Sequence, residues 1–505
     1  MIKLVFLIFF FLLAGCSDSS NNSSSNVDSY VAEDRILYFD FETTKDWDVM
    51  YQNACSLSVS SGGKTGSKSL LVENRLNSYD GPSYNIANSI KADTTYVVRG
   101  YIKSSSSENF ALMAKIGSST YKTLNTIKSS PNNWTKFRGF LRVTQSELNN
   151  GVKIYINSNT TNGNFSLDSV EIAKVSTKTK SISSLNTVGK HIVKDTQNFK
   201  FEGINIIAYS DNNEDIDKFF SYSYFNYDKS DFANIKSLGF NSIRVALWYK
   251  IFEDDLAPYV YKEAGFDWLD YLIAWAKEND LYLILDMHAP QCGGFQGPNN
   301  ITNFWDDSTC KDRFKELWKE IAKRYKDENT IGAYDIINEP CPSTQAEYLT
   351  LLNDTISGIR AIDSNHLIIA ETSFSSDSEP FTLSHDKIVY DYHFYDPWDS
   401  YTDNATSVYG TTINQATLLS NLSEILTYHA TRPLNVSEFG QKRDTFITKN
   451  AINWVSDSID IFDANSVGFQ YFSYKGNEFG LYDSSENFSE NSTKNSTLID
   501  YFQNR

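Results

Sequence analysis

Residues 331–342 read IGAYDIINEPCP, an apolar, strand-forming run that ends abruptly in the polar pair Asn338 and Glu339. Pro340 follows at once and lacks the backbone N–H that a continuing strand would need. A buried carboxyl group costs free energy unless it is paired or hydrogen-bonded. We therefore expect Glu339 to meet other polar side chains from elsewhere in the chain.

Similar apolar runs recur through residues 185–505 and alternate with helix-like stretches. The runs are FEGINII, FNSIRVAL, LYLILDM, IGAYDIIN, HLIIAE, KIVYDYHF, RPLNVSE and SVGFQYF. Eight such strands with interleaved helices predict an α/β fold, a (β/α)8 TIM barrel, in which chemistry lies at the C-terminal ends of the strands. The helix-like stretches are Phe266–Asn279, Cys310–Lys326, Gln345–Ile362, Ile413–Tyr428 and Asp444–Ile459.

Most of these runs end in polar side chains. Taken singly, each could be a strand cap, an ion-pair partner or a residue that faces water. If they gather at one mouth of a barrel, burying so many polar groups costs free energy, and a function such as binding a polar ligand would explain why they are there. The residues are Arg244, His288, Asn338, Glu339, Glu371, His393, Tyr395 and Glu438.

Glycoside cleavage is such a task, because it needs one carboxylic acid and one carboxylate on either side of the bond that breaks. Glu339 and Glu438 end the fourth and seventh runs, so a closed barrel would let them face each other across the mouth. A gap of about 5 to 5.5 Å between the two carboxyl groups would indicate the retaining, double-displacement course.

The motifs FEGIN, SIRVALWY, LDMH, DIINEP, YHFY and SEFG, in this order, resemble the family 5 glycoside hydrolases over about Thr187–Arg505. The resemblance implies that Glu339 is the general acid/base and Glu438 the nucleophile. It further implies a hydrogen bond from Tyr395 to Glu438, a nearby positive charge from Arg244, and a central sugar site lined by His288, Asn338 and His393. Asn338 would hold the sugar 2-hydroxyl.

The chain departs from that family at the end of the eighth run, where Phe472 stands in place of the usual tryptophan. Phenylalanine keeps an apolar face for a sugar ring but has no indole N–H. The departure bears on substrate identity and turnover rather than on the class of reaction. Among the aromatic residues that follow strand ends, we expect Trp398 and Trp305 to be sugar platforms.

Residues 35–175 have a different sequence pattern. Short segments in which apolar and polar residues alternate are separated by Ser, Gly and Asn, and this pattern predicts an all-β sandwich. The segments around KSLLVENRLNSYDGPSYNI, TTYVVRGYIK, NWTKFRGFLRV and FSLDSVEI resemble carbohydrate-binding modules of families 4, 9 and 22. The resemblance implies that Tyr79 stacks on sugar with Arg75 as a hydrogen-bond donor. Glu42 and Asp168 match positions that can hold a structural calcium ion, although two carboxylates are few for that ion.

Near its start the chain has one cationic residue, Lys3, then an apolar run too short to span a membrane, and then the tetrad LAGC ending at Cys16. LAGC resembles a bacterial lipobox, which implies a lipoprotein signal peptide over residues 1–16 that is cleaved before Cys16, a lipidated Cys16, and export to the cell envelope, at the outer membrane or cell surface. Residues 17–34 suit a flexible Ser/Asn-rich tether, and residues 176–184 a linker between the sandwich and the 185–505 barrel.

The formal net charge is −18 with no Lys/Arg-rich tract, which argues against a nucleic-acid partner and favours an uncharged polymer. Cys292, Cys310 and Cys341 lie close in sequence, and an exported chain can oxidise one pair of them. The spacing does not show which two of the three cysteines form the disulfide.

The sequence thus predicts a monomeric, membrane-tethered, retaining endo-β-glucanase that needs no cofactor for catalysis and acts on a polysaccharide or oligosaccharide. The alternatives are a β-mannanase, a xylanase or a β-1,3-glucan hydrolase on the same scaffold, and a lipoprotein that captures glycans without cleaving them.

Overall fold

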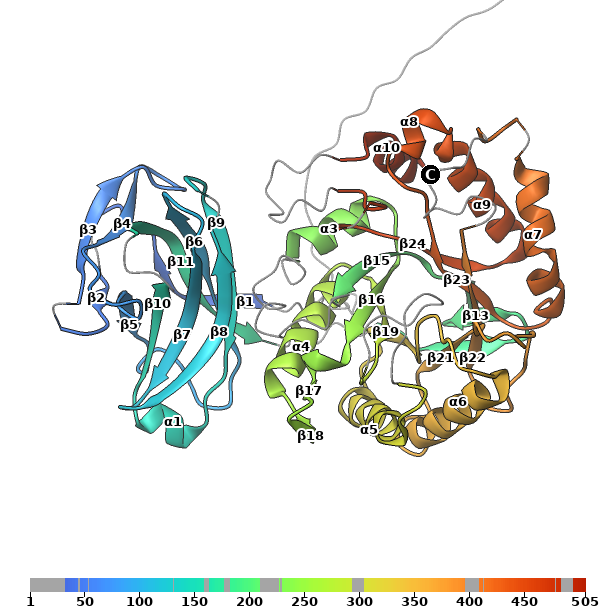
Figure 1. Cartoon of the computed structure of the whole chain (residues 1–505), viewed down its shortest axis with the longest axis horizontal. Coiled ribbons are helices and arrows are strands. Elements are labelled where there is room, and N and C mark those ends of the chain that lie inside the picture. Colours follow the sequence, from blue (N-terminus) through green and yellow to red (C-terminus); the bar gives the residue numbers. More distant parts are fainter. Residues whose placement is uncertain are drawn as a thin grey trace, which may run out of the picture.

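The computed structural model describes residues 32–505 apart from 44–45, 53, 130, 159–162, 177–181, 209–226, 228, 293–303, 396–407, 412, 477 and 483–493. It contains an all-β sandwich followed by a closed α/β barrel, which lie side by side (Figure 1). Cys16 and Trp398 lie outside the described residues. Among the described helices, none is long and apolar enough to cross a membrane.

The sandwich consists of two antiparallel sheets. One has the order β3-β4-β11-β6-β9, with β1 also paired to β11, and the other has the order β2-β5-β10-β7-β8. Alternate residues such as Val98, Leu112 and Ile154 fill the space between the sheets and are fully buried. The elements are β1 (Ala32–Phe39), β2 (Asp48–Val49), β3 (Ser56–Ser61), β4 (Lys68–Glu73), β5 (Pro82–Asn85), β6 (Tyr96–Ser104), β7 (Asn109–Ile116), β8 (Thr120–Lys128), β9 (Thr135–Leu141), α1 (Gln145–Asn149), β10 (Val152–Ser158) and β11 (Phe165–Ser176).

A small sheet of β12 (Leu185–Val188), β13 (His191–Lys194) and β14 (Gln197–Phe199) leads into the barrel. The barrel closes through parallel pairs in the order β15-β16-β19-β20-β21-β22-β23-β24, as the eight apolar runs predict. Its strands are β15 (Glu202–Ala208), β16 (Ser242–Trp248), β19 (Tyr282–Ala289), β20 (Ile331–Asp335), β21 (Leu367–Glu371), β22 (Ile388–Phe394), β23 (Leu434–Phe439) and β24 (Gly468–Tyr471).

Helices surround the barrel and follow most of its strands (Figure 1), but the described segment between β21 and β22 contains no helix. Their starts follow capping rules: Asp307 and Thr344 accept hydrogen bonds from the first turns of the α5 and α6 helices. The helices are α3 (Lys229–Ser237), α4 (Glu263–Glu278), α5 (Ser308–Tyr325), α6 (Gln345–Arg360), α7 (Gln415–Tyr428), α8 (Thr445–Thr448), α9 (Ala451–Asn465) and α10 (Ser496–Asn504), with a 3-10 turn at Tyr249–Ile251 and a hairpin of β17 (Glu253–Asp254) and β18 (Ala257–Tyr261).

The single helix expected at Asp444–Ile459 is divided. Asn450 has a φ of 59°, in the left-handed region, and separates α8 from α9. An α-helix needs a negative φ at every residue, so the chain must break there.

The sandwich packs against the barrel through the outer face of β6, β9 and β11. Ala173, Val97 and Phe140 are cross-strand neighbours on that face, and they join the apolar core of the barrel. The Phe140 ring lies 4.9 Å from the ring of Tyr271 on α4, edge to face. Arg138, two residues earlier on β9, lies over Trp275 of α4 at 4.9 Å, and its guanidinium donates to a barrel carbonyl. The two domains therefore share a packed interface.

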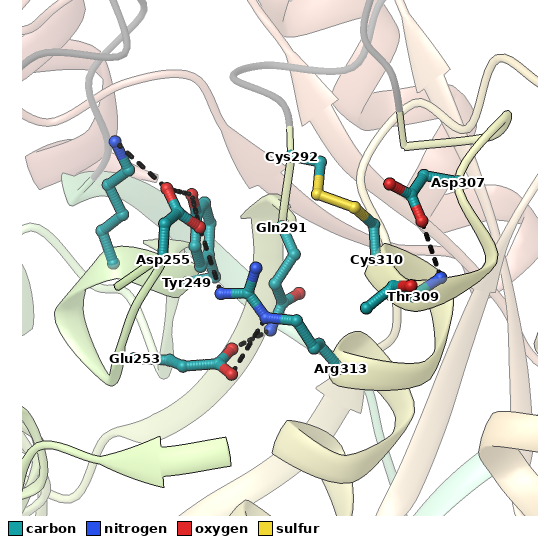
Figure 2. Close-up of a disulfide and its surroundings, with 10 residues drawn as sticks. Tyr249, Glu253, Asp255, Gln291, Cys292, Asp307, Thr309, Cys310 and Arg313 are labelled. Carbon is teal, nitrogen blue, oxygen red and sulfur yellow. Dashed lines mark hydrogen bonds and ion pairs between the residues drawn. A yellow bond between two sulfur atoms is a disulfide. The ribbon is translucent and has the colours of Figure 1, made fainter. Parts of the chain in front are cut away.

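One disulfide joins Cys292, just after β19, to Cys310 in the first turn of α5, which resolves the pairing that the spacing left open. Cys341, the third of these cysteines, has a free thiol. Beside the disulfide, buried Glu253 accepts hydrogen bonds from Gln291 and Arg313 (Figure 2). These contacts tie the β17–β18 hairpin, the end of β19 and α5 together at the rim of the barrel.

Candidate active site

Glu438, near the end of β23, is held by two donors. Arg244 Nη1 donates to its Oε1 at 2.7 Å, and the Tyr395 hydroxyl donates to its Oε2 at 2.8 Å. Its side chain is only 5% exposed. The guanidinium and the phenol thus hold this carboxyl group in one orientation, as an attacking group requires.

Arg244 is fully buried and reaches several strands at once. Its Nε donates to Asp335 at 2.8 Å, its Nη1 also to Asn205 at 3.1 Å, and its Nη2 to Asn338 at 2.9 Å. Burial would lower the pKa of Arg244, but the carboxylates around it raise that pKa well above its usual range. The guanidinium is therefore a permanent positive charge that aligns Glu438 with Asn338.

Two further carboxyl groups lie beneath Arg244. Asp286 Oδ2 lies 3.1 Å from Arg244 Nη2 and 2.8 Å from His288 Nδ1, and both side chains are fully buried. Burial raises the pKa of Asp286 and of Asp335 to about 7, against the opposing charge of Arg244. Asp286 thus fixes the orientation of the His288 ring through its Nδ1 atom, at the end of β19.

Glu339, beyond the end of β20, has a different environment from Glu438. Its Oε1 lies 3.0 Å from His393 Nδ1, and its backbone N–H donates to Glu371 Oε2 at 2.6 Å. Burial raises the pKa of Glu339 to about 7, with His288 and Arg244 opposing the rise. A carboxyl group with that pKa can carry a proton near neutral pH, as a general acid must.

The protonation of His393 follows from its partners. Ser437 Oγ donates to Asp391 Oδ2 at 2.5 Å, so its oxygen is left to accept from His393 Nε2, 2.9 Å away. Burial raises the pKa of Asp391, while hydrogen bonds from Ser437 and Asn435 oppose that rise. Burial also lowers the pKa of His393 to about 3, so the ring is neutral and its Nδ1 can accept a hydrogen bond from the protonated carboxyl group of Glu339.

Glu339, His393 and Glu438 each place one polar atom within 4.8 Å of the other two. A carboxyl oxygen of Glu339 thus lies within 4.8 Å of one of Glu438. Retaining glycosidases separate their two carboxyl groups by about 5 to 5.5 Å, whereas inverting enzymes need about 6.5 to 9.5 Å to admit a water. The gap matches the retaining arrangement.

Asn338 offers a donor for a ligand. It is fully buried, its Oδ1 accepts from Arg244, and its Nδ2 has no hydrogen-bond partner among the described residues. A buried amide N–H without a partner costs free energy, which a ligand hydroxyl would recover. This geometry is compatible with the sugar-binding role that the family resemblance implies.

The aromatic residues predicted around the site differ in placement. Phe472 is 5% exposed and packs with Ile207, Phe479 and Tyr395, so it forms part of an apolar wall beside Glu438. Trp305 lies in the barrel core against Phe304 at 5.2 Å and is 7% exposed, so the described structure does not offer its ring as an open platform. Trp398 lies outside the described residues.

On the sandwich, Tyr79 belongs to an aromatic group on the outer face of the β2-β5-β10-β7-β8 sheet. Tyr51 lies 5.5 Å from Tyr79, ring to ring, and its hydroxyl lies 3.2 Å from that of Tyr121. Tyr155 lies against Tyr121, and Lys115 extends over both Tyr51 and Tyr121. We call Tyr51, Tyr79, Tyr121 and Tyr155 the tyrosine face; Tyr79 is 50% and Tyr121 44% exposed.

Arg75 does not join that face. Its side chain is fully buried, lies 3.7 Å from Glu108, and donates to Gly163 and Ser158. The guanidinium is needed to neutralise a buried carboxylate inside the sandwich. The structure thus places Arg75 in the interior, away from the surface role beside Tyr79 that the sequence suggested.

Glu42 and Asp168 hold the turn at residues 64–68. Glu42 accepts from the N–H groups of Ser67 and Lys68, and Asp168 from those of Lys64 and Thr65. These backbone bonds fix the turn with no need for an ion. A calcium ion there remains a prediction, which calorimetric titration with calcium would test.

Sequence reasoning named the residues at the strand tips but gave no role to Asp286, Asp335, Glu371, Tyr51 or Tyr121. Asp286 and Asp335 interrupt otherwise apolar runs, LILDM and AYDII, and a carboxylate within a buried strand could have marked them. Tyr51 and Tyr121 carried no local signal, because they come together only through the pairing of distant strands.

A closed α/β barrel with two facing carboxyl groups at the C-terminal ends of its strands is the arrangement of the barrel glycoside hydrolases. The family model described as Cellulase (glycosyl hydrolase family 5) matches residues 194–478, more than half of the chain. The chain therefore belongs to glycosyl hydrolase family 5. A second model, described as a carbohydrate binding domain, matches residues 35–163 of the sandwich.

The chain is similar to Endoglucanase C of Acetivibrio thermocellus, at 33% identity over 174 residues, which are 34% of this chain and 50% of that protein. It is also similar to a β-xylosidase of Phanerodontia chrysosporium, at 33% identity over 33% of this chain and 35% of that one. Mannan endo-1,4-beta-mannosidase A of Aspergillus aculeatus is 26% identical over 39% of this chain and 57% of its own length. The chain spans little more than half, or less, of these relatives.

Two solved structures share the fold. A crystal structure of a glycoside hydrolase has a TM-score of 0.51 and 20% identity, covering 61% of this chain and 99% of its own. A mutant form of Thermotoga maritima Cel5A in complex with cellobiose has a TM-score of 0.50 and 22% identity, covering 60% and 96%. At these identities the likeness supports the barrel fold alone.

Proposed function

We propose that the protein is a retaining glycoside hydrolase in which Glu438 is the nucleophile and Glu339 the general acid/base. The observation that carries the proposal is the gap of less than 4.8 Å between carboxyl oxygens of these residues. Their surroundings differ in the required sense: Glu438 accepts from Arg244 and Tyr395, whereas burial raises the pKa of Glu339 to about 7.

In the first step, a carboxylate oxygen of Glu438 attacks the anomeric carbon, the glycosidic C–O bond breaks, and the leaving oxygen takes the proton of Glu339. In the second step, Glu339 accepts a proton from water, the water oxygen attacks the anomeric carbon, and the bond to Glu438 breaks. The proton taken from water restores the acid form of Glu339, and Glu438 is again a free carboxylate, so both residues recover their starting forms. Asn338 would donate to a sugar hydroxyl through its unpartnered Nδ2.

For the substrate, we propose a β-linked glucan, cleaved within the chain. Support comes from the family and from the similarity to Endoglucanase C. The tyrosine face of the sandwich supports a polymeric substrate, because exposed aromatic rings stack on sugar rings and a second binding site raises the local enzyme concentration. A mannan is the second candidate, favoured by the similarity to the Aspergillus mannosidase.

The proposal includes an export route. The LAGC tetrad ending at Cys16 supports a lipoprotein of the bacterial cell envelope, and the Ser/Asn-rich tether would let a lipid-anchored, monomeric enzyme reach external polysaccharide. Metabolic labelling with a palmitate analogue would test it: wild type should carry label, and Cys16→Ser should carry none.

Reducing-sugar release from a panel of β-glucan, β-mannan, xylan and β-1,3-glucan would test the activity and identify the substrate. Glu438→Gln keeps the size of the side chain but cannot form the covalent intermediate, so kcat should fall on the order of 10⁴-fold or more. Equal release by wild type and Glu438→Gln would contradict the nucleophile assignment. Binding of a glycan without release by wild type would support a capture protein instead.

A 2-deoxy-2-fluoroglycoside with a fluoride leaving group provides a second readout, since it forms the covalent intermediate and leaves it slowly. Intact mass measurement should show one added glycosyl group on wild type, and peptide mapping should locate it on Glu438. A label on any other residue would contradict the assignment.

A further inference from the structure

Glu371 is a buried carboxyl group that the reaction above does not use. It ends β21, its side chain is 1% exposed, and its Oε1 lies 3.4 Å from His393 Nδ1. The other oxygen, Oε2, accepts from the backbone N–H of Glu339 at 2.6 Å. A side chain that is costly to bury therefore contacts the acid/base both directly and through its histidine.

The backbone at Glu339 needs outside support. The β20 strand ends at Asp335, so the strand ladder does not reach Glu339. Glu339 has a φ of 40°, in the left-handed region, which costs a residue with a side chain on the order of 1 to 3 kcal/mol and persists only where neighbours impose it. The carboxyl group of Glu371 supplies the hydrogen bond that an adjoining strand would otherwise give.

The surroundings of Glu371 hold it in place. Tyr348 donates from α6 to the Glu371 carbonyl at 2.8 Å, which anchors the end of β21. Burial and the adjacent carboxyl groups raise the pKa of Glu371 well above its usual range. The titratable and charged groups that face it are Asp335 and Glu339 from β20 and its turn, Asp391 and His393 from β22, and Arg244 from β16.

We propose that Glu371 is a positioning residue for the acid/base: by accepting the Glu339 N–H, it holds the turn that aims the Glu339 carboxyl at the leaving-group oxygen. This inference rests on the proposed glycosidase function. Its consequence is specific to proton delivery, because Glu438 is held by Arg244 and Tyr395 and not by Glu371. Loss of the Glu371 bond should therefore weaken acid catalysis and spare nucleophilic attack.

Aryl β-cellobiosides separate these two contributions. A dinitrophenyl group leaves without protonation, whereas a phenyl group needs the acid, and kcat/KM reports the step that forms the glycosyl-enzyme. Glu371→Met fills the space but cannot accept a hydrogen bond. Glu371→Gln keeps an acceptor oxygen for the Glu339 N–H.

For Glu371→Met, we expect kcat/KM on the phenyl glycoside to fall about 10- to 100-fold, while the value on the dinitrophenyl glycoside changes by less than about threefold. Glu371→Gln should restore the phenyl value to within about threefold of wild type. Glu253→Gln is the matched control, because Glu253 is also a buried carboxyl at the rim but contacts Arg313 and Gln291. Any change in kcat/KM that Glu253→Gln causes should be the same on the phenyl and the dinitrophenyl glycoside.

Equal losses on both glycosides would show general damage to the fold and overturn the inference. Unchanged values on both would also overturn it, and so would a Glu371→Gln variant as impaired as Glu371→Met. Failure of wild type to cleave even the dinitrophenyl glycoside would contradict the proposed β-glucan activity, which distinguishes that failure from failure of the role of Glu371.

Discussion

At the barrel mouth, Arg244, Asp335 and Asn338 are fully buried, whereas on the sandwich Tyr79 and Tyr121 are about half exposed. The barrel groups are held by charge-assisted hydrogen bonds of 2.7 to 2.9 Å. The tyrosine face is held mainly by ring packing, with one hydroxyl contact of 3.2 Å.

The difference matches the two tasks that we propose for these regions. Chemistry on a glycosidic bond needs fixed charges in a site that excludes water, because such a site strengthens electrostatic interactions and needs no reorganisation during reaction. Binding a polymer needs only apolar faces and a few polar contacts at an accessible surface. Changes at the mouth should therefore cost stability and catalysis together, and changes at the tyrosine face should cost binding alone.

The largest effect is expected for Arg244→Met. Removing one partner of a buried charge network costs about 3 to 5 kcal/mol, because Asp335 and Glu438 lose their counter-charge. Thermal unfolding should show the loss, and kcat should fall at temperatures where the variant is folded, because Glu438 is no longer oriented.

Arg75→Met is the matched control in the other domain, since Arg75 is also buried and paired with a carboxylate, Glu108. It should lower stability and leave kcat on a soluble oligosaccharide unchanged. Equal loss of kcat in both variants would remove the distinction between the two regions.

The pH dependence of the wild type should follow Glu339. Its pKa is raised to about 7, and the acid step needs the protonated form, so kcat/KM should be retained below pH 7 and fall as pH rises through it. Glu339→Gln should lower kcat/KM for poor leaving groups by about 10²- to 10⁴-fold and abolish this basic limb. A basic limb that survives in Glu339→Gln would assign the acid to another residue.

On the tyrosine face, Tyr79→Ala and Tyr121→Ala should each weaken polysaccharide binding by about 1 kcal/mol, or roughly fivefold in Kd. Affinity electrophoresis in gels that contain the polysaccharide would measure the effect. kcat on a short soluble oligosaccharide should not change, because neither tyrosine contacts the barrel mouth. A fall in kcat on the short substrate would show that the tyrosine face also affects catalysis at the barrel mouth.

The smallest effect is expected at the interface between the domains. Arg138→Ala combined with Phe140→Ala removes the contacts to Trp275 and Tyr271, and small-angle X-ray scattering should show a larger radius of gyration. Hydrolysis of insoluble polymer should fall about two- to fivefold, with soluble turnover unchanged. Lys122→Ala, which breaks a surface ion pair with Glu147, is the control. An unchanged radius would show that other contacts suffice to hold the domains together.

The fold and the reactive tips were predictable for local reasons. Each barrel strand is a short apolar run with its polar residues at one end, so Arg244, Glu339 and Glu438 could be placed at a common mouth before any contact was known. Arg75 was misplaced because its partner Glu108 is distant in sequence. Glu371 had no assigned role, because its contact with the Glu339 N–H depends on a turn of positive φ that no residue pattern marks.

The sequence by itself determined the two-domain order, the barrel strands and the position of Glu339 and Glu438 at strand ends, because these depend on periodicity and on the order of motifs along the chain. Only the tertiary structure decided the Cys292–Cys310 pair, the gap between Glu339 and Glu438, and the assembly of the tyrosine face. Those features are distances between residues far apart in the chain, and they arise when barrel closure and sheet pairing bring the backbone together in one register.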